Sequence, residues 1–186
     1  MNMFAKTETP IHELYVIKPK KIEDERGYLS RIYCSKLMNK VGWHGRIAQV
    51  NYTKTIKKGT IRGFHFQHPP YAEHKYIKCT KGKVYDVALD LRKDSPTFLS
   101  TYPQILSQDN CISFLLPPGV AHGFQALTDD VELLYLHSEP YNSDFDDGVN
   151  PLDPLLNIDW PYQEISLSKK DNNREFIKES FRGIEI

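Results

Sequence analysis

Residues 75–91 read KYIKCTKGKVYDVALDL and predict two short strands joined by a Thr-Lys-Gly turn. In the second strand the odd-numbered residues Tyr85 to Leu91 are apolar, whereas the even-numbered residues Val84 to Asp90 combine small apolar side chains with two carboxylates. Side chains alternate across a strand, so one face is an apolar packing surface and the other is mixed. If the mixed face looks into a barrel, the interior is a polar pocket; the alternative is that Asp86 and Asp90 face solvent on an outer sheet. This strand by itself favours neither arrangement.

Similar short strands are predicted on both sides of this pair. They cover residues 47–54, 61–66, 112–116, 123–127 and 131–137, with turns rich in Gly, Pro and Asp between them. Strands at this close spacing indicate an all-β sandwich or barrel. Helix is predicted only over residues 35–41, with Ser35 as the N-cap, and near residues 173–180. Pro151, Pro154 and Pro161 argue that residues 148–165 form an ordered loop arm rather than a strand.

The composition is that of an ordinary globular chain. Its 186 residues suit one domain with terminal arms, and 24 Lys and Arg residues balance 24 Asp and Glu residues. A balanced chain has no general attraction to nucleic acid, so we expect none as a partner. The dispersed cysteines Cys34, Cys79 and Cys111 favour reduced thiols in a cytoplasmic protein over a disulfide framework or a zinc site. No signal peptide is visible and the longest apolar stretches are strand-sized, so we expect no membrane association.

Two short patterns carry candidate chemistry. The first is Gly59-x5-His65-x-Gln67, followed by Glu73, and the second is PPGVAH at residues 117–122. Together they resemble the two halves of the cupin barrel signature, in which a His-x-His pair, a Glu and a further His bind a metal ion. Gln67 replaces the second histidine of that pair, and a neutral amide is a poor ligand for a transition metal. We therefore expect no metal; the alternative is a metal-dependent cupin oxygenase or isomerase that uses His65, His122 and Glu73.

Longer segments extend this resemblance along most of the chain. The matching segments are DERGY (24–28), QVN (49–51), IRGFHFQHPP (61–70), HKY (74–76), GKVYDVALDLRKDSPTF (82–98), PPGVAHGFQAL (117–127), Tyr135 with Tyr141, DWP (159–161) and SKKD (168–171). In their order and spacing they resemble the dTDP-4-dehydrorhamnose 3,5-epimerase family, which consists of metal-free cupins of nucleotide-sugar pathways.

The resemblance implies the architecture of the chain. We expect a single cupin-like epimerase domain over residues 1–186, built as a jelly-roll β-barrel with short helices. The barrel is expected over about residues 46–140, between an N-terminal strand arm over about residues 1–45 and an irregular C-terminal arm over about residues 141–186. A homodimer is also expected, partly because an exposed N-terminal strand favours pairing with a second copy.

The resemblance further implies an epimerase that inverts C3, C5 or both in an NDP-4-keto-6-deoxyhexose without a cofactor. Inverting a carbon next to a ketone requires a base to remove its proton, a group to hold the enolate oxygen, and an acid on the other face. By the resemblance His65 is the base, Asp171 fixes its tautomer, Lys75 holds the enolate oxygen and Tyr135 is the acid. Without the motif these residues would be read as a structural histidine, a turn carboxylate, a solvated lysine and a core tyrosine.

The substrate-binding residues follow from the same resemblance. Guanidinium groups fit phosphate oxygens bidentately, so two arginines are expected at the diphosphate. Tyr28 is expected to stack on the nucleotide base from the neighbouring subunit, and His122 to help hold the enolate. The implied set is Arg26 and Arg62 at the diphosphate, Gln49, Asn51 and Tyr28 at the nucleotide, Tyr141 and Lys170 at the pocket, and Asp86 and His122 at the sugar.

Two positions depart from the family pattern at places expected to lie near the substrate. Ser30 stands where the family usually has a carboxylate that contacts the thymine ring, and Glu73 stands where it usually has Gln. The nucleotide, dTDP or GDP, therefore stays open, and so do the sugar and the number of inverted carbons. Epimerases that act at one carbon, or on GDP-linked heptoses, share the same acid–base chemistry. Outside the enzymes, the alternative is a non-catalytic protein that binds nucleotide sugars.

Overall fold

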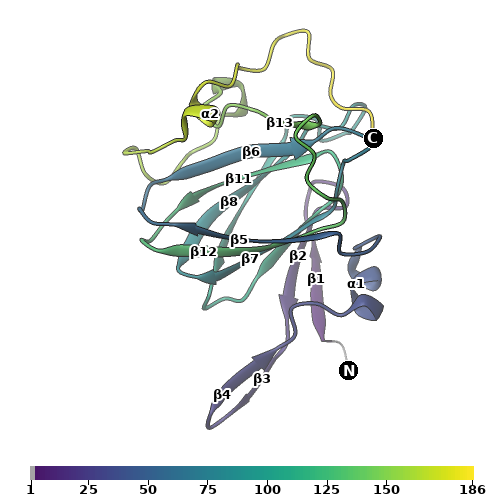
Figure 1. Ribbon diagram of the computed structural model, residues 1–186, viewed down its shortest axis with the longest axis vertical. Coiled ribbons are helices and arrows are strands. Elements are labelled where there is room, and N and C mark those ends of the chain that lie inside the picture. Colours follow the sequence, from purple (N-terminus) through teal and green to yellow (C-terminus); the bar gives the residue numbers. More distant parts are fainter. Residues whose placement is uncertain (1–2) are drawn as a thin grey trace.

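The structure, a computed structural model, describes residues 3–186 and consists mainly of antiparallel strands in two facing sheets (Figure 1). The six-stranded sheet has the order β1 (Phe4–Glu8), β2 (Tyr15–Pro19), β10 (Ser113–Leu116), β7 (Lys75–Lys81), β12 (Val131–His137) and β5 (Gln49–Thr55). The five-stranded sheet has the order β13 (Asp146–Gly148), β6 (Ile61–Gln67), β11 (Val120–Ala126), β8 (Lys83–Asp90) and β9 (Thr101–Ser107). The prediction of an all-β fold is confirmed.

The inner strand β8 is buried on both faces. Val84 and Ala88 belong to the core between the two sheets, whereas Val87 and Leu89 belong to a second core that includes Trp160 of the C-terminal arm. Asp86 and Asp90 are both 0% exposed. The alternative that these carboxylates face solvent is therefore wrong, because the opposite sheet covers one face of the strand and the C-terminal arm covers the other.

Two strands and one helix differ from the sequence-based expectations: β9, β13 in the C-terminal arm that was expected to be irregular, and the helix expected near residues 173–180. β9 is absent from the predicted strands. It contains Pro103 and lies at the edge of its sheet, where proline is tolerated. The helix expected near residues 173–180 does not form. In that segment the Ile177 N–H donates to Asp153 Oδ2 at 2.6 Å, so a tertiary contact takes the backbone donor that a helix would use.

The helices that do form are short. α1 (Ser35–Val41) is capped by Cys34, which has an extended backbone and makes no side-chain cap bond, so the prediction of Ser35 as N-cap is wrong by one residue. The C-terminal arm contains η1 (Pro154–Leu156) and α2 (Lys169–Asn172), and Ser168 caps α2 by accepting a hydrogen bond from the Asp171 N–H. No helix within residues 3–186 is long and apolar enough to cross a membrane.

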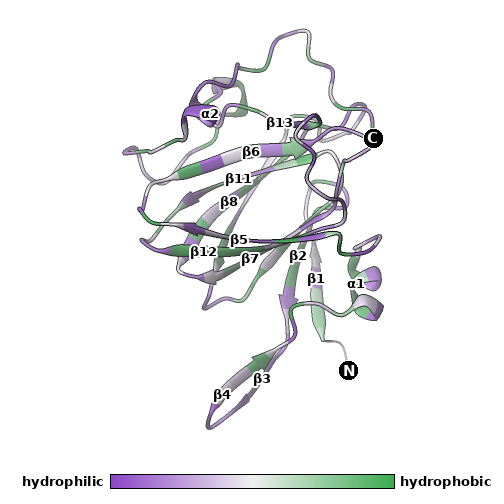
Figure 2. Cartoon of the chain, viewed as in Figure 1, coloured by the Kyte–Doolittle hydropathy of each residue, from purple (hydrophilic) through white to green (hydrophobic). Residues whose placement is uncertain are grey.

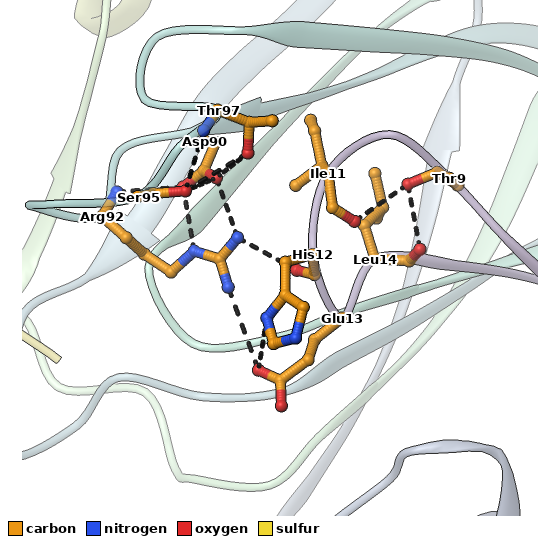
Figure 3. Close-up of polar contacts among 9 residues, drawn as sticks. All are labelled: Thr9, Ile11, His12, Glu13, Leu14, Asp90, Arg92, Ser95 and Thr97. Atoms are coloured by element: carbon orange, nitrogen blue, oxygen red, sulfur yellow. Dashed lines mark hydrogen bonds and ion pairs between the residues drawn. The ribbon is translucent and has the colours of Figure 1, made fainter.

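A buried ion pair ties the N-terminal segment to the barrel (Figure 3). Asp90, at the end of β8, accepts hydrogen bonds from Arg92 Nε at 2.9 Å and Arg92 Nη2 at 2.8 Å. The hydroxyls of Ser95 and Thr97 each donate to the same carboxylate at 2.7 Å. Arg92 Nη2 also donates to the backbone oxygen of His12 at 3.0 Å. One carboxylate thus organises the loop after β8 and, through Arg92, the segment between β1 and β2.

Replacing Asp90 with Asn is expected to lower the free energy of unfolding at neutral pH by on the order of 3 kcal/mol, because it removes the close charge partner of buried Arg92 and leaves, among the described residues, only Glu13, whose Oε2 lies 3.9 Å from Arg92 Nη1. Burial raises the pKa of Asp90, but the bonds from Arg92, Ser95 and Thr97 outweigh it and lower the pKa below its ordinary value. The stabilisation that the ionised Asp90 carboxylate gives the wild-type protein is therefore fully present above the unfolded-state pKa of about 3.9. It is lost as the pH falls through the lower folded-state pKa.

Urea unfolding of both proteins between pH 3 and pH 7 checks this expectation, and the difference between them should shrink as the pH falls. Asp24→Asn is the control, because Asp24 pairs with Arg26 in the same chemical way on the surface and should contribute little. Equal stability of wild type and Asp90→Asn at pH 7 would contradict the structural role of this ion pair.

The hairpin of β3 (Lys21–Asp24) and β4 (Gly27–Ser30) projects away from the two main sheets (Figure 1). Figure 2 shows apolar colouring on part of this projecting hairpin. Ile22, Tyr28 and Leu29 are 51%, 54% and 62% exposed. This hairpin leaves apolar side chains exposed instead of burying them against the rest of its chain, so packing within the chain stabilises it little.

Candidate active site

His65 and Asp171 form a hydrogen-bonded pair between β6 and the C-terminal arm. Nε2 of His65 lies 2.7 Å from Oδ1 of Asp171, and the two residues are 106 positions apart in the sequence. Asp171 is positioned by the Ser168 cap of α2. The Asp171 side chain is 5% exposed and the His65 side chain is 40% exposed. The carboxylate is thus enclosed, while the imidazole has a side that a ligand can reach.

The surroundings of Asp171 keep its carboxylate ionised. Burial alone would raise the pKa of Asp171, but hydrogen bonding and attraction to His65, with further bonds from Ser168 and the Gly63 backbone, lower it below its usual value. An ionised acceptor requires a donor, so the bonding assigns the proton of the neutral imidazole to Nε2. Nδ1 then carries the lone pair and is the atom that can accept a proton.

Lys75 brings a cation next to this pair. It begins β7, and its Nζ donates to the backbone oxygen of His65 at 3.0 Å. The same nitrogen lies 3.0 Å from Oε1 of Glu73, and the two side chains are 10% and 4% exposed. A lysine in this setting is a fixed donor rather than a mobile surface charge.

Asp86, His122 and Tyr135 form a second group between the sheets. His122 is the register partner of His65, its Nε2 lies 2.8 Å from Asp86 Oδ2, and its ring centroid lies 5.8 Å from that of Tyr135. Burial raises the pKa of Asp86 against the opposing effect of His122. Burial, and then the Asp86 carboxylate, raise the pKa of Tyr135 far above that of an ordinary tyrosine. Tyr135 therefore holds its proton at neutral pH and is available only as a donor.

Two neighbouring cavities open beside His65, and both are lined by His65, Tyr141 and Asp146. The larger has a volume of about 450 Å³ and the smaller about 110 Å³. The larger volume falls in the range of small-molecule sites. The other predicted site residues on these walls are Arg62, Lys170 and Asp171 in the larger cavity and Gln49, Asn51 and Lys75 in the smaller.

Five predicted site residues line neither cavity: Asp86, His122 and Tyr135, which form the buried group described above, and Arg26 and Tyr28. Arg26 lies in the turn of the β3–β4 hairpin and pairs with Asp24 on the surface. The hydroxyl oxygen of Tyr28 lies 3.7 Å from the sulfur of Cys111. The structure therefore separates Arg26 and Tyr28 from both cavities of their own chain.

Several residues around the site were not singled out by sequence reasoning. Asp146 Oδ2 lies 2.5 Å from Lys170 Nζ and connects β13 to the residues of α2 across the larger cavity. Nothing in the sequence around Asp146 signals this contact. His137 lies two residues after Tyr135, and the rings are stacked with centroids 6.0 Å apart. The alternation of side chains along a strand places these two rings on one face and could have identified His137.

The residues of the alternative metal site do not converge. His65 bonds to Asp171 and His122 bonds to Asp86, while the Gln67 amide nitrogen lies 3.3 Å from Glu73 Oε2. Within residues 3–186, no group of three or more His, Cys, Asp or Glu side chains is arranged to hold a metal ion. His65 and His122 are arranged instead as two separate His–Asp pairs.

Comparisons with known proteins agree on one family. Residues 8–179 match the family model described as dTDP-4-dehydrorhamnose 3,5-epimerase. A curated protein of that name from Sinorhizobium fredii is 36% identical over 95% of this chain and 92% of its own length. A dTDP-4-dehydrorhamnose 3-epimerase from Streptomyces niveus is 34% identical over 91% of this chain and 82% of its own.

A solved structure gives the same result in three dimensions. The crystal structure of dTDP-4-dehydrorhamnose 3,5-epimerase from Bacillus anthracis with TDP and PPi bound superposes with a TM-score of 0.91 at 37% identity. The match covers 94% of this chain and 99% of that one. The fold is therefore the cupin-like all-β fold of these enzymes.

Proposed function

Because the chain belongs to the dTDP-4-dehydrorhamnose 3,5-epimerase family and is a nucleotide-sugar epimerase, we propose that it inverts C3 and C5 of a dTDP-linked 4-keto-6-deoxyhexose. The observation that carries the proposal is the His65–Asp171 pair in a cavity wall, with the Lys75 ammonium beside it. Together these residues supply a base and an electrophile in one place, which is the minimum for removing a proton next to a ketone.

In the proposed first step, Nδ1 of His65 takes the proton from the carbon next to the C4 ketone. Asp171 holds the opposite nitrogen and stabilises the imidazolium that results. The electron pair of the broken C–H bond moves to the ketone oxygen, and the resulting enolate oxygen is held by Lys75. His122 is a second donor in its imidazolium form, because its Nε2 already faces Asp86.

In the proposed second step, Tyr135 returns a proton to the same carbon from the other side. β6 carries His65 and β12 carries Tyr135, and these strands belong to the two opposite sheets. A sugar between the sheets thus meets the base from one side and the acid from the other, which is the geometry that inversion requires. Asp86 orients His122 in this scheme through their 2.8 Å contact.

We propose that the nucleotide end of the substrate lies toward the cavity walls formed by Arg62, Lys170, Tyr141, Gln49 and Asn51. Two cations support binding of a diphosphate, and the polar side chains on β5 offer donors and acceptors to a base. Arg62 Nε is held by Thr55 Oγ1 at 2.9 Å, which fixes the orientation of its guanidinium group.

Solvent deuterium uptake with matched dTDP- and GDP-linked 4-keto-6-deoxy sugars tests the proposed function. We expect uptake and inversion at two carbons of the dTDP sugar, with no loss of rate after dialysis against a metal chelator. Uptake at a single carbon would reassign the protein as a 3- or 5-epimerase. Faster turnover of the GDP sugar, or activity that requires a stoichiometric metal ion, would contradict the proposal.

We also propose that the protein is a homodimer in which the β3–β4 hairpin reaches the site of the partner subunit. The exposed apolar residues of the hairpin, and the position of Arg26 and Tyr28 outside their own cavities, support this arrangement. β1 and β5 are both edge strands and so have unpaired backbone groups that a second copy could engage. Sedimentation equilibrium should give twice the chain mass of 21.6 kDa; a monomer with full activity would contradict the arrangement.

The proposed location is the cytoplasm. Cys34, Cys79 and Cys111 are free thiols, and two of the three are buried. Unpaired thiols suit a reducing compartment. Fractionation of the cells that produce the protein tests this proposal, and recovery outside the cytoplasm would contradict it.

A further inference from the structure

Glu73 makes a contact to which the proposed reaction steps assign no task. Its side chain is 4% exposed, and its Oε1 lies 3.0 Å from Lys75 Nζ. Its other oxygen, Oε2, lies 3.3 Å from the amide nitrogen of Gln67. Glu73 is thus an enclosed carboxylate that touches the lysine next to the base.

Gln67 is itself held firmly, so it fixes the direction of Glu73. Its amide nitrogen also contacts the backbone oxygens of Tyr71 at 3.1 Å and Pro140 at 3.3 Å. Its amide oxygen accepts a hydrogen bond from the Asn142 N–H at 2.7 Å. The position that would carry a metal-binding histidine in other cupin barrels therefore serves here to orient a carboxylate.

Glu73 stays ionised in this enclosed position. Burial raises the pKa of Glu73, but the charge of Lys75, a contact with His137 and the bonds from Lys75 and Gln67 outweigh it and lower the pKa. His137 Nδ1 lies 3.8 Å from Glu73 Oε1. The Glu73 carboxylate and the Lys75 ammonium thus form an enclosed ion pair.

We propose that Glu73 is a positioning residue for the reaction: its ion pair with Lys75 fixes the ammonium inside the barrel and directs it so that one N–H faces the substrate. An ammonium group has three N–H donors. Among the described residues, one is directed at Glu73 and one at the backbone oxygen of His65. The third is left for the oxygen of the ketone. This inference rests on the proposed function, because it assigns Glu73 a task only through the role of Lys75.

A double-mutant cycle on Glu73 and Lys75 tests the proposal in the full-length protein. Glu73→Gln keeps the shape and the acceptor but removes the charge, and Lys75→Met removes the ammonium. We expect Glu73→Gln to lower kcat on the order of 10- to 100-fold with little change in KM, because Glu73 acts through Lys75 and not on the substrate. We expect Lys75→Met to lower kcat on the order of 100- to 1000-fold.

The double variant is the decisive protein. If Glu73 acts through Lys75, Glu73→Gln has no further effect on kcat once Lys75 is Met. The melting temperatures should also be coupled. Lys75→Met leaves the buried Glu73 carboxylate without its charge partner, so this variant should melt at a lower temperature than the double variant, in which the carboxylate is also removed. Glu185→Gln is the matched control, because Glu185 pairs with Lys93 on the surface and should leave kcat and KM unchanged.

The possible outcomes separate this inference from the proposed function. Absence of exchange in the wild-type protein with every 4-keto sugar would overturn both. If the wild-type protein exchanges deuterium, but the kcat of the double variant falls by the product of the two single-variant losses, only the role of Glu73 is overturned. A raised KM with unchanged kcat in Glu73→Gln would also overturn it, because Glu73 would then bind substrate directly.

Discussion

Replacing His65 with Asn is expected to lower the rates of deuterium uptake and of epimerisation on the order of 100- to 10,000-fold, the range for loss of a general base. Asn is a suitable replacement because it fits in the space of the imidazole and has no basic nitrogen, while Asp171 keeps its bonds from Ser168 and the Gly63 backbone. The variant should therefore fold normally and still bind the nucleotide diphosphate. The measurement is the initial rate of uptake at both carbons, together with calorimetric binding of the nucleotide.

His68→Asn provides the matched control. His68 lies three residues further along and also pairs with a carboxylate, its Nε2 lying 3.1 Å from Asp147 Oδ2, but it lines neither of the two cavities beside His65. The rate of deuterium uptake by His68→Asn should match that of the wild-type protein. Near-normal uptake in His65→Asn, or equal losses in both variants, would show that His65 is not the base.

Replacing Tyr135 with Phe is expected to separate two events that the wild-type protein couples. Without the phenol no acid faces the second side of the enolate, so inversion should slow on the order of 100- to 10,000-fold. His65 still removes a proton and can return one to the same side, so deuterium uptake with retention should continue at a measurable rate. Product analysis by NMR, which reports both the label and the configuration of each carbon, distinguishes the two events.

Tyr162→Phe is the control for this substitution, because the Tyr162 hydroxyl donates to the backbone oxygen of Leu127 at 3.5 Å, whereas the Tyr135 ring lies beside His122 between the sheets. It should invert both carbons at the wild-type rate. Unchanged inversion in Tyr135→Phe would assign the acid to another group. Loss of uptake together with inversion would mean that Tyr135 also takes part in the first step.

The fold was largely predictable because its signals are local. The alternation in residues 83–91 and the frequent turns predict an all-β chain, since each depends only on neighbours in sequence. The burial of Asp86 and Asp90 was not predictable from that strand. It depends on the opposite sheet, because the even-numbered face of β8, with Val84 and Ala88, packs into the core between the two sheets.

The candidate site was less predictable because its contacts are distant in sequence. His65 and Asp171 are 106 residues apart, and only the resemblance to a family paired them before the structure did. α2 has four residues, too few for a periodic pattern, so the element that carries Asp171 has no signal of its own. Glu73 appeared in the sequence as a departure from the family pattern, and only the structure gives it a partner in Lys75.

A single wash-in experiment tests the central claim, that His65 and Tyr135 act on opposite faces of one enolate. The dTDP-linked 4-keto-6-deoxy sugar is incubated with the wild-type protein in D₂O, the reaction is stopped at low conversion, and each carbon next to the ketone is examined for configuration and label. We predict that every inverted carbon carries one solvent deuterium. Inversion that retains the original hydrogen would contradict the account. If His65 removes one proton and Tyr135 donates another, the added hydrogen comes from the solvent and not from the substrate.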